Sequence, residues 1–114
     1  MAIYSNLTID QGSTFTVTID VTDASDNILN LTGYSVAGQM RKTYESITKT
    51  DFTASVQNAG TGKVKIALTA AQTNAIAAGR YVYDVEITSG EGIVTRVVEG
   101  QIEVTPGVTR YWQI

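Results

Sequence analysis

Hydrophobic and polar residues alternate with a period of two along much of the chain. The clearest run places Phe15, Val17, Ile19 and Val21 on one side, with polar residues at the positions between them. Successive side chains of a β-strand point to opposite faces, so the run predicts a strand with one buried face and one face in water. Each of the four apolar side chains should contribute about 1.5–3 kcal/mol if it is fully buried.

The same alternation predicts further strands. Its apolar positions fall within residues 34–40, 52–56, 64–68 and 81–87. Residues typical of turns separate these runs, in segments 23–27, 58–62 and 89–92. Strands at this spacing, with little helix between them, favour an antiparallel β-sandwich or a small barrel.

One segment is predicted to be helical, and it lies between two predicted strands. Thr69 is a suitable N-cap, residues 70–78 are rich in alanine, and Gly79 can end the helix in a left-handed conformation. The segment is too short to be stable alone, so we expect one or two turns that connect consecutive strands. The strand that follows, 81–87, is expected to be central.

The last two strands are predicted to form a hairpin around Gly90 and Glu91. A two-residue type II′ turn there places Tyr83 opposite Val98 and Val85 opposite Arg96. This register brings the apolar residues of both strands to one face. Arg96 is the exception on that face, so we expect it near the end of the sheet with its guanidinium in solvent or against a carboxylate.

Composition supports the strand assignment and limits the chemistry. Of the 114 residues, 40 are Thr, Val or Ile, whose β-branched side chains suit a pleated sheet. The chain has no Cys and no His, which removes the thiol nucleophile, the imidazole base and the usual zinc ligands. A net charge of −3 argues against binding nucleic acid. No apolar run approaches the roughly 18 residues that span a bilayer, so we expect no membrane partner.

Asp84 and Glu86 are the best candidates for catalytic carboxylates. They lie two residues apart on one predicted strand, so their side chains share a face at a separation of roughly 7 Å, near that of a general acid and base pair. Nothing in the sequence builds the apolar pocket that acid catalysis requires. We therefore expect a solvated sheet face and no enzyme, with a carboxylate-based hydrolase as the distant alternative.

A second group of oxygen-bearing side chains crowds one loop. Asp20, Asp23, Asp26, Asn27 and Asn30 could supply ligands to a calcium ion. They do not have the spacing of an EF-hand loop, and Asp and Asn are also the usual residues of turns. The turn interpretation is favoured, so no metal site and no cofactor are predicted.

The sequence contains one short cluster of basic residues, which follows a predicted strand. Arg41 and Lys42 are followed by Tyr44, with Lys49 close behind. Phosphate binding would need a glycine-rich turn or a helix N-terminus to add backbone donors, and neither is evident here. A solvated loop is the favoured interpretation.

The sequence predicts a single β-sandwich domain over residues 1–107 and a separate tail over residues 108–114. The tail contains Arg110, Tyr111, Trp112 and Ile114, which are unusual in a frayed, polar terminus. It either folds back over the sandwich or docks on another subunit. Trp and Tyr are favoured anchors at protein interfaces, so these four residues are the candidate partner contacts.

Several segments occur in an order that resembles a known group of proteins. They are residues 7–15, residues 30–34 with 40–42, and residues 68–73 followed by 78–86. This order resembles small immunoglobulin-like β-sandwich proteins of tailed bacteriophage virions, including fibre-collar proteins of long-tailed phages and N-terminal domains of some baseplate proteins. The resemblance implies an all-β, immunoglobulin-like antiparallel β-sandwich with one short helical turn between strands.

The segment 78–83 also resembles the tyrosine corner of immunoglobulin domains. In that motif a Tyr two residues before a Cys bonds back to nearby backbone. Tyr81 would take this role. Tyr83 stands where the Cys would be, so the inter-sheet disulfide is absent and the resemblance is architectural.

The function implied by the resemblance is structural. The chain would be a virion component made in the host bacterial cytoplasm, which agrees with the lack of a recognisable targeting segment at residues 1–6. We expect a tail-tip or baseplate collar or adaptor that forms a homo-oligomeric ring, contacts other virion proteins and anchors fibres. The alternatives are a capsid decoration protein and a host-glycan-binding module, the latter suggested by Tyr4, Tyr44 and Tyr111.

Overall fold

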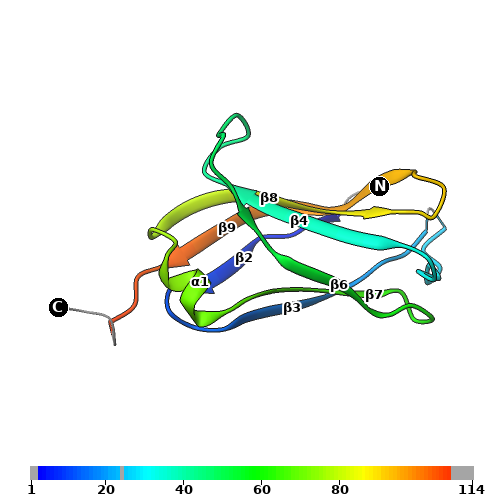
Figure 1. Cartoon of the computed structure of the whole chain (residues 1–114), viewed down its shortest axis with the longest axis horizontal. Helices are drawn as coiled ribbons and strands as arrows, with labels where there is room; N and C mark the ends of the chain where they lie inside the picture. Colours follow the sequence, from blue (N-terminus) through cyan, green and yellow to red (C-terminus); the bar gives the residue numbers. More distant parts are fainter. Residues whose placement is uncertain (1–2, 24, 109–114) are drawn as a thin grey trace.

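The computed structural model describes residues 3–23 and 25–108, which fold into two facing β-sheets with one short helix (Figure 1). The larger sheet has the order β1-β9-β8-β4-β5, with β2 also paired to β9, and the smaller has the order β3-β7-β6. The elements are β1 (Ile3–Tyr4), β2 (Leu7–Asp10), β3 (Phe15–Asp20), β4 (Ser35–Arg41), β5 (Thr50–Asp51), β6 (Thr53–Asn58), β7 (Lys63–Leu68), α1 (Ala70–Asn74), β8 (Gly79–Thr88) and β9 (Val94–Thr105).

The strand order is that of an immunoglobulin-like sandwich. From β3 onward the chain crosses between the two sheets several times. The sheet β3-β7-β6 therefore faces the strands β9-β8-β4 of the larger sheet. This arrangement matches that of strands B-E-D and G-F-C in immunoglobulin domains. The predicted fold class is therefore confirmed. The N-terminal strands β1 and β2 pair in parallel with β9, and among the described residues β3 pairs with β7 alone.

The core lies between the two sheets and is built from the predicted alternating positions. Val64, Ile66 and Leu68 of β7 are almost fully buried, as are Val85 and Ile87 of the central strand β8. Phe52 lies in the connection between β5 and β6, with its ring centroid 6.2 Å from that of Phe15. Large apolar side chains from both sheets thus interdigitate as the period-two pattern requires.

The helix is shorter than predicted. Thr69 is its N-cap, and Gln72 completes a capping box with it. The helix ends at Asn74, whereas the alanine-rich run continues to residue 78. Gly79 is the first residue of β8, so the prediction that it ends the helix is wrong. Instead, Thr73 is fully buried and its hydroxyl donates to the Ser13 carbonyl at 2.8 Å, which fixes α1 against the turn before β3.

The predicted hairpin register is also wrong. The turn between β8 and β9 is a three-residue loop closed by a bond from the Ser89 N–H to the Ile93 carbonyl, with Gly92 in the left-handed region at φ 90°. A bulge between Val85 and Glu86 then shifts the ladder by one more residue. As a result Tyr83 lies opposite Gly100 and Val85 lies opposite Val98.

Candidate interaction surfaces

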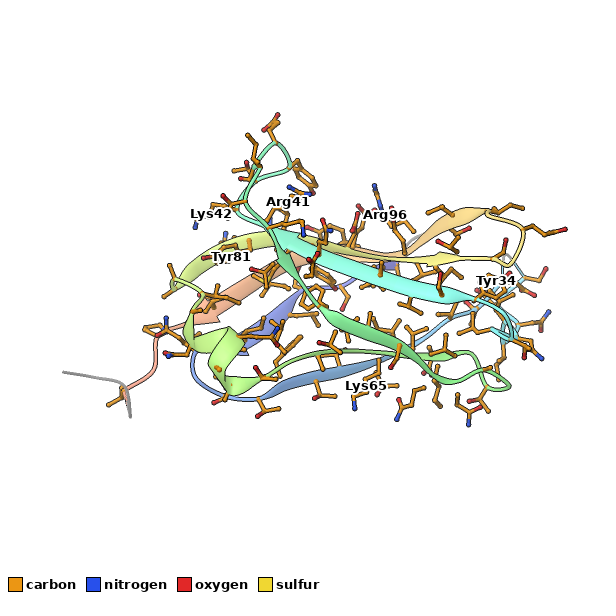
Figure 2. The ribbon with its side chains drawn as sticks, viewed as in Figure 1. Tyr34, Arg41, Lys42, Lys65, Tyr81 and Arg96 are labelled. Carbon is orange, nitrogen blue, oxygen red and sulfur yellow. The ribbon has the colours of Figure 1, made fainter. Side chains whose placement is uncertain are left out.

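Tyr81 forms the bond that defines a tyrosine corner. At the start of β8 its hydroxyl donates to the Ala77 carbonyl at 2.6 Å, four residues upstream. The Lys42 ammonium lies over the ring, 4.9 Å from its centroid, and Figure 2 shows the two side chains next to each other. Burial raises the pKa of the Tyr81 hydroxyl above its usual value of 10.0. These contacts tie the β4–β5 loop to the beginning of β8.

Tyr83 occupies the position of the missing cysteine and is buried in the core. Its ring makes an edge-on contact with Phe52, with 6.3 Å between centroids. Its hydroxyl donates to the Ser5 carbonyl at 2.7 Å. Burial raises the pKa of this hydroxyl above 10.0. Tyr83 therefore links the central strand to the N-terminal segment, where a disulfide would have linked the two sheets.

Arg96 lies on the outer face of the larger sheet, which corrects the prediction that it interrupts the core face. The three-residue turn makes Glu86 its partner in the ladder, and the bulge that follows leaves Val97 and Val98 both buried in consecutive positions. Figure 2 shows the Arg96 side chain on the outer surface. Its Nε lies 3.2 Å from the Asp84 carboxylate and its Nη1 lies 3.4 Å from that of Glu99. A carboxylate partner for the guanidinium was predicted, but not on this face.

Asp84 and Glu86 share a shallow hollow of about 380 Å³ on that outer face. Its floor is formed by β4, β8 and β9, and Tyr44 of the β4–β5 loop stands at its edge. The lining carries charged side chains of both signs, so the two carboxylates do not face an apolar pocket of the kind acid catalysis uses. In the described part of the chain, Asp84 is engaged by Arg96, and the arrangement is that of a polar sheet surface.

The basic cluster holds its own loop together. Arg41 donates to the Ser46 carbonyl at 2.6 Å and to the Gln39 amide oxygen at 3.0 Å, both within the hairpin of β4 and β5. Lys49 pairs with Asp51 at 2.6 Å, and this bond lowers the pKa of the Asp51 carboxyl. The β4–β5 loop extends away from the body of the sandwich (Figure 1). Arg41 and Lys49 thus have partners within the same hairpin, whereas Lys42 lies over the Tyr81 ring of β8.

The acidic loop uses its oxygens for turns, as predicted. The Asp23 carboxylate accepts from the backbone N–H of Ser25 at 2.8 Å and of Asn27 at 3.0 Å. Asn30 accepts from the N–H of Thr32 at 2.9 Å, and Asp26 adopts a positive φ of 64°. Over residues 3–23 and 25–108, no three acidic side chains converge as a metal site would require.

A second hollow, of about 160 Å³, opens between the sheets at the end of the sandwich that holds the β8–β9 hairpin. Polar and apolar groups both contribute to its lining, and the carboxylate of one of its two acids, Asp20, pairs with Lys63 at 2.6 Å. The lining residues are Ile3, Asp20, Val21, Thr22, Asp23, Leu29, Tyr34, Ile87, Thr95 and Val97. We call this the end hollow. No pattern in the sequence indicates this hollow, because its residues come from five separate segments.

The predicted partner contacts Arg110, Tyr111, Trp112 and Ile114 lie outside the described residues, as does Tyr111 of the predicted glycan-binding set. The other two tyrosines of that set, Tyr4 and Tyr44, are 62% and 76% exposed. Among the residues that are described, no helix has the length and hydropathy needed to cross a membrane.

No family model and no curated protein matches the sequence. Solved structures are similar at low identity, among them the following three. An internalin-like protein of Listeria monocytogenes is 17% identical, with a TM-score of 0.44 over 93% of this chain and 28% of that one. CopC from Methylosinus trichosporium OB3b is 12% identical, with a TM-score of 0.45 over 90% and 88% of the two chains. A family 123 glycoside hydrolase from Clostridium perfringens is 11% identical, with a TM-score of 0.40 over 94% and 23%.

The chain spans less than a third of the internalin-like protein and of the glycoside hydrolase. At these TM-scores and identities, none of the three bears on what the chain does.

Proposed function

We propose that the chain is a structural subunit of a tailed bacteriophage virion. Its place would be the tail tip or baseplate, as a collar or adaptor that assembles into a ring and joins fibres to the tail. In this role the chain provides binding surfaces and a rigid framework, and it catalyses no reaction.

The observation that carries the proposal is the position of the phage-like segments in the fold. Residues 7–15 form β2 and lead into β3, residues 40–42 end β4, residues 68–73 lead from β7 into α1, and residues 78–86 fall mostly in β8. Residues 30–34 lie in the loop before β4. Most of the segments that resemble virion proteins thus belong to the framework of the sandwich. The charged side chains on the outer face, Asp84, Arg96 and Glu99, pair with each other, which suits a structural surface better than an acid and base pair.

Two other functions, capsid decoration and glycan binding, are the alternatives to this proposal. A capsid decoration protein would have the same fold and a much larger copy number. A glycan-binding module has one specific observation in its favour, since the exposed ring of Tyr44 stands beside the outer hollow and sugars stack on aromatic rings.

A double substitution of the outer carboxylates separates a structural role from catalysis. In the phage that encodes the chain, Asp84→Asn with Glu86→Gln should leave particle yield, incorporation of the subunit and plaque titre at wild-type levels. The expected effect on folding is small, because the exposed pair between Asp84 and Arg96 contributes at most about 1 kcal/mol. Glu91→Gln, in the exposed hairpin turn, is the control for loss of charge.

Particles that contain normal amounts of the doubly substituted subunit but have lost infectivity would contradict the proposal. That result would assign chemistry to the two carboxylates.

A further inference from the structure

The strand β3 forms an open edge of the smaller sheet. It pairs with β7 on one side, and within residues 3–23 and 25–108 no strand pairs with its other side. Figure 1 shows β3 at the lower border of the sandwich. An open edge presents a row of N–H and C=O groups that can pair with another chain.

The ladder with β7 shows which backbone groups of β3 face the open edge. Val21 continues the register of β3 with β7, and its N–H donates to the Gly62 carbonyl at 2.7 Å. Hydrogen-bonded and non-hydrogen-bonded pairs alternate in an antiparallel ladder, so the odd-numbered residues of β3 bond to β7. The N–H and C=O groups of Thr16, Thr18 and Asp20 therefore point away from β7.

The inward side chains of β3 are incompletely covered. Val17 and Ile19 pack against the core but remain partly exposed, whereas their partners on β7, Ile66 and Val64, are fully buried. The difference arises because β7 has a strand on each side and β3 has a strand on one side. A further strand along β3 would remove more of the two side chains from water, which favours association.

β3 lacks the features that keep exposed edges from pairing. Its six residues contain no proline, lysine or arginine, and its ladder with β7 has no bulge. Its only charged residue, Asp20, pairs with Lys63 of β7 at 2.6 Å. The opposite edge of the sheet differs, because β6 has a bulge between Val56 and Asn58. Of the two edges of the smaller sheet, β3 is therefore the one suited to pairing.

The sequence of β3 is complementary to a second copy of itself. In an antiparallel pair with Val17 opposite Val17 of the other copy, Phe15 meets Ile19 and Thr16 meets Thr18. Apolar side chains then face each other on the inner side and threonines on the outer side, and such cross-strand pairs stabilise a ladder. The backbone groups of Thr16 and Thr18 that point away from β7 form the hydrogen-bonded pairs in this register. The carboxylates at the ends of the two strands lie about 20 Å apart, well beyond the Debye length of about 8 Å, so like charges do not oppose the contact.

We propose that β3 of one copy pairs antiparallel with β3 of a second copy and joins the two smaller sheets into one continuous sheet. The contact is isologous and closes at two copies. It differs from the heterologous contact that a ring requires, so it goes beyond the proposed function and rests on no part of it.

The size of the contact predicts a weak dimer. The six residues of β3 extend about 20 Å, and the two sheets of a sandwich lie about 10 Å apart. The paired edges therefore bury an area near or below the roughly 1,200 Å² at the lower limit of stable interfaces. We expect the dimer to form only at high protein concentration.

Sedimentation and hydrogen exchange of the purified chain test the pairing. With rising concentration, the weight-average mass should approach that of two copies and not exceed it. Exchange of the Thr16 and Thr18 N–H groups should slow as the fraction of monomer falls, by about tenfold when about nine tenths of the chain is paired. The Ala54 N–H is the internal control, because it points away from β7 at the edge of β6, and its exchange should not change.

Charges on the exposed outer face test the contact without entering the core. Thr16→Lys with Thr18→Lys places lysines opposite lysines in the paired strands, so this variant should stay monomeric where the wild type dimerises. Thr53→Lys with Ser55→Lys is the matched control and should dimerise like the wild type. These residues have the same spacing on the exposed face of β6, and Ser55, like Thr18, lies opposite Lys65.

A mixture of opposite charges tests the two-fold geometry. Thr16→Glu with Thr18→Glu should also stay monomeric, and its one-to-one mixture with the β3 lysine variant should dimerise, because residue 16 of one copy faces residue 18 of the other. Each variant is first checked for cooperative thermal unfolding. If a variant does not fold, the exchange measurement on the wild-type chain decides the question.

Four results would overturn the inference. A wild-type chain that stays monomeric, with unchanged exchange at Thr16 and Thr18, removes the contact. Slow exchange at these groups at every concentration means that the chain covers its own edge. Dimerisation of the β3 lysine variant at the wild-type level places the contact elsewhere, and a mixture that stays monomeric excludes the antiparallel register. None of these results depends on whether the chain is found in virions, so they are distinct from failure of the proposed function.

Discussion

Two tyrosines on β8 bond to the segments that flank the larger sheet, in a chain that lacks the inter-sheet disulfide of many immunoglobulin domains. Tyr81 bonds to the Ala77 carbonyl and Tyr83 to the Ser5 carbonyl, so each hydroxyl fixes a neighbouring segment to the central strand. The sequence identified Tyr81 through the corner motif. It did not indicate the partner of Tyr83, because the contact joins residues 78 positions apart.

Burial of Tyr83 and partial burial of Tyr81 predict a loss of stability in alkali. Burial raises the pKa of both Tyr81 and Tyr83 above 10.0 in the folded state. In the unfolded chain both ionise near the ordinary value, so the stabilisation is complete below about pH 10 and is lost as the pH rises through the folded-state pKa. The free energy of unfolding, measured in urea from about pH 8 to about pH 11, should fall at the alkaline end.

Tyr83→Phe should flatten this fall, and it should also cost about 1 kcal/mol at neutral pH through the lost bond to Ser5. Tyr44→Phe, at an exposed position, is the control and should follow the wild-type profile. A Tyr83→Phe profile that is parallel to the wild-type profile through the alkaline range would show that this hydroxyl is not the titrating group.

At the scale of elements, the N-terminal segment can lie on the larger sheet because β9 has a glycine where the two cross. A Cβ at Gly100 would overlap the Ser5 carbonyl, the same carbonyl that accepts from Tyr83. The Ser5 N–H in turn donates to the Glu99 carbonyl at 2.8 Å. This close approach places β1 and β2 beside β9 and leaves β3 as an edge strand of the smaller sheet, within the described residues.

Gly100→Ala should therefore displace the N-terminal segment. We expect a loss of about 1–3 kcal/mol in the free energy of unfolding, with faster hydrogen exchange at the Ser5 N–H. Gly60→Ala is the matched control, because its added Cβ would meet nothing closer than 3.7 Å and its effect should stay within about 0.5 kcal/mol. Equal stability of the two variants would mean that the crossing at Gly100 adapts without cost.

The sequence predicted strand positions well and their pairing less well. Alternation depends only on which residues are apolar, so the runs 15–21, 34–40 and 64–68 were placed correctly. The β8–β9 register depends on the length of the turn and on the bulge at Val85 and Glu86, and neither leaves a periodic signal. The three-residue turn alone pairs Arg96 with Glu86 and so places it on the outer face. The end hollow was not predictable, because it forms only when distant segments meet.

At the scale of the whole molecule, both hollows expose polar as well as apolar groups. On the outer face, Arg96 pairs with Asp84 and Glu99, and near the end hollow the Asp20 carboxylate pairs with Lys63. Copies of one sandwich that join through two unlike surfaces close into a ring or extend as a filament, which is the physical basis of the proposed assembly role.

The most direct test of that role is the copy number of the chain in purified virions, measured by quantitative mass spectrometry against the major shell protein. The proposal predicts a small number set by the symmetry of the tail. A number comparable to that of the shell protein would assign the chain to capsid decoration. Absence from the particle would contradict the structural role altogether.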